Sequence, residues 1–590
     1  MKTTKSILRA ICLAVVPLAI TSLPQSAQAQ LSWGTNGTGG SSTWNATNTN
    51  WYNGASNVVW DSTSATFAGT AGAVTVSGTQ NATGLTFSTS GYTLGGSGAI
   101  NLTGAPVISG LATINTVLSG TSGMTLQTGS KTLGGDNTGL SGLVTLNGTS
   151  SFVAARIANS NALGSSSALA DRVNIVNGGS GATLQLNSGI ILPKYITTVG
   201  TTTIETITGN TSLTGNLVPG GTLVFSLAAS TNLTLSGSAG LGQSGSSIQT
   251  TGTGRLIVDA AAGVTAYGLQ IRNSASVQVN SGATLGSANV FFDGAAGAPI
   301  LSLNGSTVSN SVYVGSTPTP VIENMAAGSS TFNGQILNNG GNFTTTLRST
   351  TSGTLNVSGL INDSTRTASV SIGSTSFSNS GVVNLSRATG NTYDGGTTVH
   401  SGTLLVSNTS NSATGTGAVT VASGAILGGS GFITGAVTVN GTLAPGTSAG
   451  IINTGALSLS SGSLLAVEIN GITAGTLYDQ VKVTGSVTLG GNLDVVLGYT
   501  PVETTNFFII DNDGAEAVTG LLNGYAQGDF FTLHGSSWLI SYEGNIGTNA
   551  FLGGNDVVIQ AIPEPSTTLL VGLGLAAGLF GLRRRTSLRA

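Results

Sequence analysis

The sequence predicts an all-β protein whose body is a right-handed parallel β-helix, a solenoid of short stacked strands with capped ends. Of 590 residues, 90 are Gly, 12 are Pro, 6% are charged and 39% are hydrophobic. The apolar residues are mostly Val, Ile, Leu and Ala set among Thr, Ser, Asn and Gly, a mixture of strand formers and turn formers. A disordered chain would combine low hydrophobicity with high charge. Short alternating segments recur at a spacing of about 20 residues, which is typical of a solenoid repeat.

The clearest alternating segments lie at 418–421, 436–439, 456–459 and 486–489, with spacings of 18, 20 and 30 residues. Each alternates apolar with polar or small residues, as expected for a strand with one buried face. One coil cannot bury its inner face alone, so neighbouring coils must stack. A set of β-sandwich domains is the competing fold, but it would show domain-sized periods near about 100 residues. Related alternations occur at 73–76, 232–235 and 276–279.

The N-terminus reads as a secretory signal peptide covering 1–29. Three basic residues precede an apolar stretch at 10–20, and Ala27 and Ala29 supply the small residues that signal peptidase needs, so we expect cleavage after Ala29. The single cysteine, Cys12, lies inside this peptide. The mature chain therefore has no disulfide and no cysteine-bound metal.

The rest of the chain divides into four regions. We expect a Trp-rich N-terminal cap with the first rungs at 30–110 and solenoid repeats at 111–498, clearest at 390–498. An aromatic C-terminal cap at 499–560 precedes a sorting tail at 561–590. Solenoids need such caps to cover their end rungs. The alternative for the aromatic residues of the C-terminal region is a sugar-stacking surface. These residues are Tyr499, Phe507, Phe508, Tyr525, Phe530, Phe531, Trp538, Tyr542 and Phe551.

The tail combines a short motif, an apolar run and a basic end. Pro563, Glu564 and Pro565 are followed by an apolar run at 567–582 and then by three arginines. Sixteen residues span about 24 Å as a helix, which is short for a membrane. We expect a short transmembrane segment with the arginines on the cytoplasmic side. The basic residues are Arg583, Arg584 and Arg585.

This arrangement resembles the PEP-CTERM sorting signal. The resemblance implies that an exosortase-like membrane enzyme recognises the tail and processes it during export. The protein would then be anchored in the inner membrane only transiently. The alternative is an ordinary C-terminal membrane anchor. Both interpretations place the body outside the cytoplasm.

The segments at 393–404, 441–446 and 478–481, together with the Trp-rich opening, resemble the autotransporter-associated β-strand repeat. That family occurs in passenger regions of secreted surface proteins. A translocator barrel would appear as alternating segments of about ten residues near the C-terminus, and no such run is visible. We therefore expect a passenger-like chain without a translocator barrel, exported through its two terminal signals.

Charge excludes one class of partner. Without the signal peptide and the tail, the body carries 10 basic and 19 acidic residues, a net charge of −9. Binding nucleic acid needs clustered Lys and Arg to neutralise phosphates. We expect no nucleic-acid partner.

Groups for catalysis are sparse, and we predict no enzyme, no catalytic residue and no cofactor-binding residue. His400 and His534 are the only histidines, and His400 is expected to point outward from a strand. Asp511, Asp513 and Glu516 on a turn are weak calcium candidates, although Asp-Gly pairs are also common turn formers. No other metal or cofactor is expected.

Together these features predict an exported structural or adhesive protein, displayed on the cell surface or held in the extracellular matrix. The PEP-CTERM resemblance implies a link to the biofilm matrix. The expected partners are signal peptidase, an exosortase-like enzyme, and extracellular polysaccharide or further copies of the chain. A glycan-binding module and a β-helix polysaccharide lyase or hydrolase are the alternatives.

Overall fold

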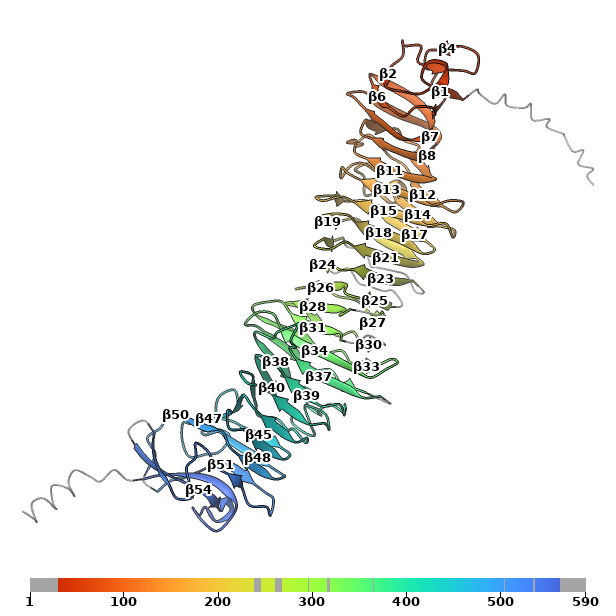
Figure 1. The fold of residues 1–590 in the computed structure, drawn as a ribbon. Coiled ribbons are helices and arrows are strands. Elements are labelled where there is room, and N and C mark those ends of the chain that lie inside the picture. Colours follow the sequence, from red (N-terminus) through yellow and green to blue (C-terminus); the bar gives the residue numbers. More distant parts are fainter. Residues whose placement is uncertain are drawn as a thin grey trace, which may run out of the picture.

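The computed structural model describes residues 30–237, 246–259, 268–294, 297–315, 319–363, 366–502, 504–533 and 536–562. These residues form a long rod of stacked coils that runs from the N-terminal to the C-terminal region (Figure 1). Along the rod the strands pair in parallel, and the antiparallel pairs of named strands lie at its two ends. The predicted β-solenoid is confirmed.

The largest sheet has 25 strands. Its strands are β1 (Leu31–Trp33), β2 (Ser42–Trp44), β3 (Trp51–Tyr52), β4 (Asn57–Val58), β5 (Ser64–Phe67), β6 (Ala73–Val76), β7 (Thr79–Gly95), β8 (Ala99–Ile114), β9 (Val117–Ser119), β10 (Met124–Gln127), β11 (Gly129–Leu133), β12 (Val144–Gly148), β13 (Val153–Ile157), β14 (Val173–Asn177), β15 (Ala182–Leu186), β17 (Ile196–Val199), β18 (Thr202–Thr206), β20 (Leu217–Gly220), β21 (Thr222–Leu227), β23 (Ser247–Gly252), β25 (Gly268–Arg272), β27 (Asn289–Asp293), β30 (Val312–Val314), β33 (Ile336–Asn338) and β36 (Ile361–Asn362).

From β16 onward, a second sheet of 15 strands covers another side of the rod, with one strand in each successive coil. Its strands are β16 (Ile191–Leu192), β19 (Asn210–Leu213), β22 (Asn232–Leu235), β24 (Arg255–Val258), β26 (Ser276–Asn280), β28 (Ile300–Asn304), β31 (Val321–Asn324), β34 (Phe343–Ser349), β37 (Ala368–Ile372), β39 (Thr397–Val399), β41 (Val419–Val421), β43 (Val437–Val439), β46 (Leu457–Leu459), β49 (Val487–Leu489) and β52 (Thr519–Gly520).

Two smaller sheets complete the C-terminal half. The nine-stranded sheet contains β29 (Thr307–Val308), β32 (Ser329–Phe332), β35 (Thr354–Val357), β38 (Val382–Leu385), β40 (Thr403–Val406), β42 (Ile426–Gly429), β44 (Thr442–Pro445), β47 (Leu464–Ile469) and β50 (Asn492–Leu497). The six-stranded sheet contains β45 (Ile451–Thr454), β48 (Gln480–Val483), β51 (Asn506–Asn512), β55 (Asp556–Ala561), β54 (Ser536–Gly544) and β53 (Phe530–Leu533). Among the described residues, short 3-10 turns lie at Thr35–Gly37, Leu169–Asp171 and Ile546–Thr548.

The sheets replace one another along the rod. The 25-stranded sheet reaches its last strand, β36, after the nine-stranded sheet has begun at β29. The 15-stranded sheet starts earlier, at β16, and continues to β52. Each coil there therefore pairs with its neighbouring coils through strands in more than one sheet, although the set of sheets changes along the rod.

The sequence repeat coincides with the strand register. β41, β43, β46 and β49 pair in succession, and Val419 faces Val437, which in turn faces Leu457. The spacings of 18, 20 and 30 residues in the sequence are thus the lengths of successive coils. The related alternations also form strands, as β6, β22 and β26. Their apolar positions face inward, and buried residues from Leu31 to Ala561 form one continuous cluster.

Glycine is frequent partly because backbones of neighbouring coils nearly touch at the corners. A Cβ atom on Gly359 would lie 1.6 Å from the carbonyl oxygen of Gly334. A Cβ atom on Gly334 would lie 2.0 Å from the carbonyl oxygen of Asn310. Three successive coils are in close contact at this corner, and only glycine leaves enough room for them.

Buried asparagines join coils at other corners. Asn391 accepts a hydrogen bond from the Ile361 N–H at 2.9 Å and donates one to the Ala413 carbonyl at 2.7 Å. Asn408 likewise accepts from the Phe432 N–H at 2.8 Å. A single amide side chain supplies both a donor and an acceptor. These residues therefore satisfy backbone groups that the turn itself leaves without partners.

Four tryptophans pack together in the first coils at the N-terminal end. β1 pairs antiparallel with β3, which pairs antiparallel with β4. Trp33, Trp44, Trp51 and Trp60 are all buried, and their rings lie against one another and against Phe67. These rings occupy the interior of the first coils. Whether 30–110 acts as a separate cap stays a prediction.

The C-terminal end changes from parallel to antiparallel pairing. β51 stacks in parallel on β48, but its other neighbour, β55, runs antiparallel and is followed by β54 and β53. The regular stacking of coils ends here. The limits of the predicted cap, 499–560, stay a prediction. No helix within the described ranges is long and apolar enough to cross a membrane.

Candidate functional site

The two predicted processing sites lie outside the residues that the structure describes. This holds for the signal peptide with Ala27 and Ala29, and for the tail from Pro563 onward, including the apolar run at 567–582 and the three arginines. The sorting role of the tail has support from a family match described below, whereas signal-peptide cleavage after Ala29 stays a prediction.

Of the calcium candidates, Asp511 lies in β51, and Asp513 and Glu516 lie on the turn after it. Asp511 forms an ion pair with Lys482 at 3.4 Å, while Asp513 and Glu516 are exposed. Between them, Asn512 is buried, and its side-chain nitrogen donates to the Glu516 carbonyl at 2.9 Å. In the described part of the chain, no group of three or more His, Cys, Asp or Glu side chains is placed to hold a metal. Calcium binding at this turn stays a prediction.

Two other carboxylates near the C-terminal end of the rod accept hydrogen bonds from the backbone. Asp479 accepts the N–H groups of Gly450 at 2.7 Å and of Glu468 at 2.8 Å, and so joins the beginning of β45 to β47. Asp556 accepts the N–H groups of Asn512 and Ile546, both at 2.8 Å. Asp479 and Asp556 therefore have a structural role.

Asp479 should make stability depend on pH. Burial, opposed by its two N–H hydrogen bonds and reinforced by Glu468, raises the pKa of Asp479 to about 6. A raised folded-state pKa gives stability that is present at low pH and is lost as pH rises through about 4 to about 6. We expect the advantage in unfolding free energy of wild type over Asp479→Asn to be larger at about pH 4 than at neutral pH. Chemical denaturation of both proteins across this window measures it.

The asparagine variant cannot titrate, so its lost hydrogen bond contributes a constant offset at every pH. A stability difference that grew with pH would contradict the prediction. It would mean that the two N–H groups stabilise the carboxylate more than burial destabilises it.

The predicted outward position of His400 is confirmed, since it is exposed after β39. His534 lies outside the described residues. Of the nine C-terminal aromatics, Phe507, Phe508, Phe531, Trp538 and Tyr542 are buried. Phe530, at 70% exposure, is the most open of them. Five of the nine aromatics therefore belong to the core, and a sugar-stacking role for the other four stays an open alternative.

A buried ionic network was not predicted from the sequence. Glu323 on β31 lies between Ser302 of β28 and Arg348 of β34 in the strand register. Its carboxylate accepts a hydrogen bond from the Ser302 hydroxyl at 2.6 Å and one from Arg348 Nε at 2.8 Å. The guanidinium also lies 5.0 Å from the ring centre of Phe377. Coil lengths, which set these neighbours, are not visible in the residue types themselves.

Two lysines are also buried. Lys131 donates to the carbonyls of Gln127, Thr128 and Gly129, and burial lowers its pKa to about 8. Burial also lowers the pKa of Lys194, while Asp171 opposes this shift. Both lie 1% exposed or less. Their place inside the rod makes them structural groups.

An aromatic pair lies on the outward side of the 25-stranded sheet. Gln249, Gln270, Phe291, Tyr313 and Leu337 occupy matching positions on β23, β25, β27, β30 and β33. The rings of Phe291 and Tyr313 stack with centroids 5.2 Å apart and planes 20° apart. Both residues are partly exposed, whereas their strand neighbours Phe292 and Val314 are buried.

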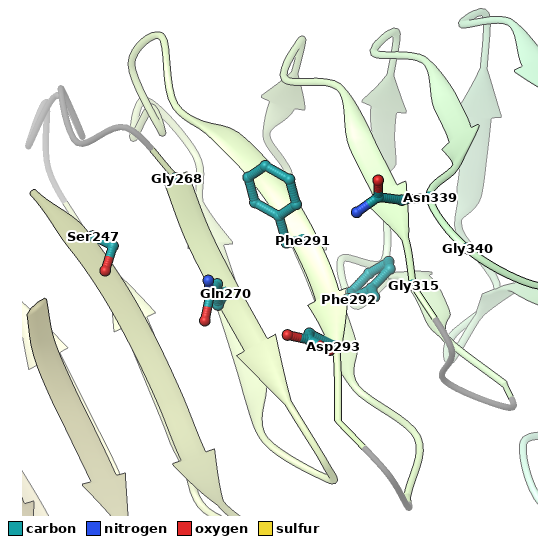
Figure 2. A pocket seen from close by; sticks show the side chains of 9 residues that line it. All are labelled: Ser247, Gly268, Gln270, Phe291, Phe292, Asp293, Gly315, Asn339 and Gly340. Atoms are coloured by element: carbon teal, nitrogen blue, oxygen red, sulfur yellow. The ribbon is translucent and has the colours of Figure 1, made fainter. Parts of the chain in front are cut away.

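A pocket of about 420 Å³ lies beside this pair. Figure 2 shows Gln270 on β25 and Phe291 and Asp293 on β27, with Asn339 farther along the rod. Ser247 and Gly268 complete the side nearer to the N-terminus. The lining thus combines Phe291 and Phe292 with a hydroxyl, two amides and a carboxylate.

A known motif and a known protein resemble parts of this chain. Residues 561–585 match the PEP-CTERM protein-sorting motif. The chain is 35% identical over 178 residues to the Adhesin BmaC autotransporter of Brucella suis biovar 1 (strain 1330). The match covers 25% of this chain and 5% of that protein, so this chain spans a small part of the relative's length.

Proposed function

We propose that this protein is exported and displayed on the outer surface or in the surrounding matrix of a bacterium with two membranes, where its rod has a structural or adhesive role. The observation that carries the proposal is the single file of 15 paired strands in an extended rod, on a chain that ends in a sorting motif. Stacked coils suit display over a distance, because each coil contacts only its neighbours and adds length. Similarity to an adhesin supports the adhesive part.

The sorting step would use the tail. An exosortase-like enzyme would recognise Pro563-Glu564-Pro565 while the apolar run holds the chain transiently in the inner membrane. Removal of the tail would then release the body to the surface. Signal peptidase would act earlier, after Ala29.

Intact-mass measurement of surface, medium and membrane fractions tests this proposal. We expect the exported form to begin after Ala29 and to end near Pro563. Glu564→Ala should leave protein in the membrane fraction with Arg583 to Ala590 still attached. Glu543→Ala, which removes an exposed carboxylate from the body, is the control and should be processed normally.

Full processing of Glu564→Ala would contradict the sorting role. The adhesive role has its own test: cells without the protein should adhere less to surfaces and to one another. A polysaccharide-cleaving activity is the alternative class of function. It would be recognised by the release of unsaturated or reducing sugar ends from a polysaccharide.

A further inference from the structure

The outward aromatic pair has no role in the core. Most outward positions of the rod carry Thr, Ser, Asn or other small residues, which water solvates readily. Phe291 and Tyr313 instead stack on each other at the surface while their inward neighbours fill the interior. Partly exposed aromatic groups beside a few polar groups are typical of small-ligand sites.

Glycine at 268 makes room for the ring. A Cβ atom on Gly268 would lie 2.6 Å from Cε2 and 3.0 Å from Cδ2 of Phe291. The ring therefore leans over the backbone of β25 in a place where any other residue would displace it. Gly268 has no positive φ angle, so alanine could adopt the same backbone conformation without strain. Glycine is needed here because the Phe291 ring occupies the space of a Cβ atom, not because of the backbone conformation.

The polar groups set the chemistry of the ligand. The pocket is lined by the Ser247 hydroxyl, the amides of Gln270 and Asn339, and the carboxylate of Asp293. None of its lining residues is Lys or Arg, and the nearby Arg272 donates to Gln249 at 3.2 Å. A carboxylate without a cation in the lining disfavours an anionic ligand. Hydroxyl and amide groups suit a ligand that carries many neutral donors and acceptors.

We propose that this pocket, formed by Gly268, Gln270, Phe291 and Asp293, binds a neutral saccharide. A pyranose ring has an apolar face of C–H groups that packs on an aromatic ring, and hydroxyls at its edge that reach amides and carboxylates. A volume of about 420 Å³ lies within the range of small-ligand sites, about 300–1,000 Å³. The proposal names a ligand class for the adhesive role proposed above and rests on that role for its biological setting.

The test is binding of cellohexaose, maltohexaose and dextran to the full-length protein by calorimetry and saturation-transfer NMR. We expect at least one of them to bind, with saturation strongest on the C–H groups of a single sugar face. Gly268→Ala and Phe291→Ala should each weaken that binding by about tenfold or more. Phe152→Ala, which removes a half-exposed ring from a distant coil, is the matched control and should bind normally.

Two results would overturn the site. One is that none of the three neutral saccharides binds; the other is that binding is unchanged in both Gly268→Ala and Phe291→Ala. Unaltered melting curves for the variants would show that the rod is intact. Processing and cell adhesion are measured separately, so loss of this site would leave the proposed export and surface role standing.

Discussion

Arg348→Met should lower the free energy of unfolding by about 3–5 kcal/mol, because it leaves the Glu323 carboxylate buried without its cation. The Glu323 side chain is 3% exposed, and Ser302 would be the one remaining donor among the contacts described above. The substitution also removes the guanidinium from the face of Phe377. Denaturant unfolding combined with hydrogen exchange of β28, β31 and β34 measures the effect.

Two controls separate charge from packing. Lys482→Met breaks the ion pair with Asp511. Because the Lys482 side chain is 44% exposed, the change should alter the free energy of unfolding by less than about 1 kcal/mol. The double variant Glu323→Leu/Arg348→Met removes both charges and should be more stable than Arg348→Met alone. Equal losses in the single and double variants would contradict the argument, because the cost would then come from packing.

The solenoid could be predicted from the sequence because each coil repeats the strand arrangement of the coil before it. When coils stack in parallel register, Val419, Val437 and Leu457 meet the same environment and take the same residue type. The spacing between equivalent segments is then the coil length. The alternation within each segment shows which side is buried.

Side-chain contacts between neighbouring coils could not be predicted in the same way. Glu323 and Arg348 are 25 residues apart, and Phe291 and Tyr313 are 22 apart, so their partners depend on the length of each individual coil. That length varies from 18 to 30 residues even within the clearest repeats. An error of one residue would turn every side chain to the other face.

The same difference between local patterns and contacts across coils applies to the functional features. The sorting motif is read from consecutive residues, so it was predictable and matches at 561–585. The pocket beside Phe291 is assembled from strands β23, β25 and β27 and from Asn339, spread over about ninety residues of sequence. No local signal marks it. Gly268 is one of 90 glycines, and its particular role appears only when the ring above it is placed.

Trp51→Ala should cost about 3–5 kcal/mol, as expected for a large buried aromatic side chain. Trp51 is fully buried, and its ring centre lies 4.5 Å from that of Trp60 and 5.0 Å from those of Trp33 and Trp44. Its indole N–H has no hydrogen-bond partner among the described residues, so its removal leaves no acceptor there unsatisfied. The loss would come from apolar contacts and the cavity left behind.

The position of the effect distinguishes a solenoid from a globular domain. Each coil contacts only its neighbours, so hydrogen-exchange protection should fall in β1 to β8 and stay unchanged in β37 to β50. Tyr52→Ala, on the same strand but only partly buried, should cost less than about 1 kcal/mol. Loss of protection along the whole rod in Trp51→Ala would contradict this one-dimensional behaviour.

An opened N-terminal end should also change how the protein associates. The first coils present strand edges whose N–H and C=O groups can pair with another chain when the covering segment is displaced. β3 and β4 pair antiparallel beside β1, and Trp51 of β3 packs on Trp60; we predict that this segment covers the end of the rod. We therefore expect Trp51→Ala to form end-to-end oligomers, detected by light scattering, while wild type and Tyr52→Ala do not. Equal association of all three proteins would show that contacts between rods form along their sides, where the tryptophan cluster has no influence.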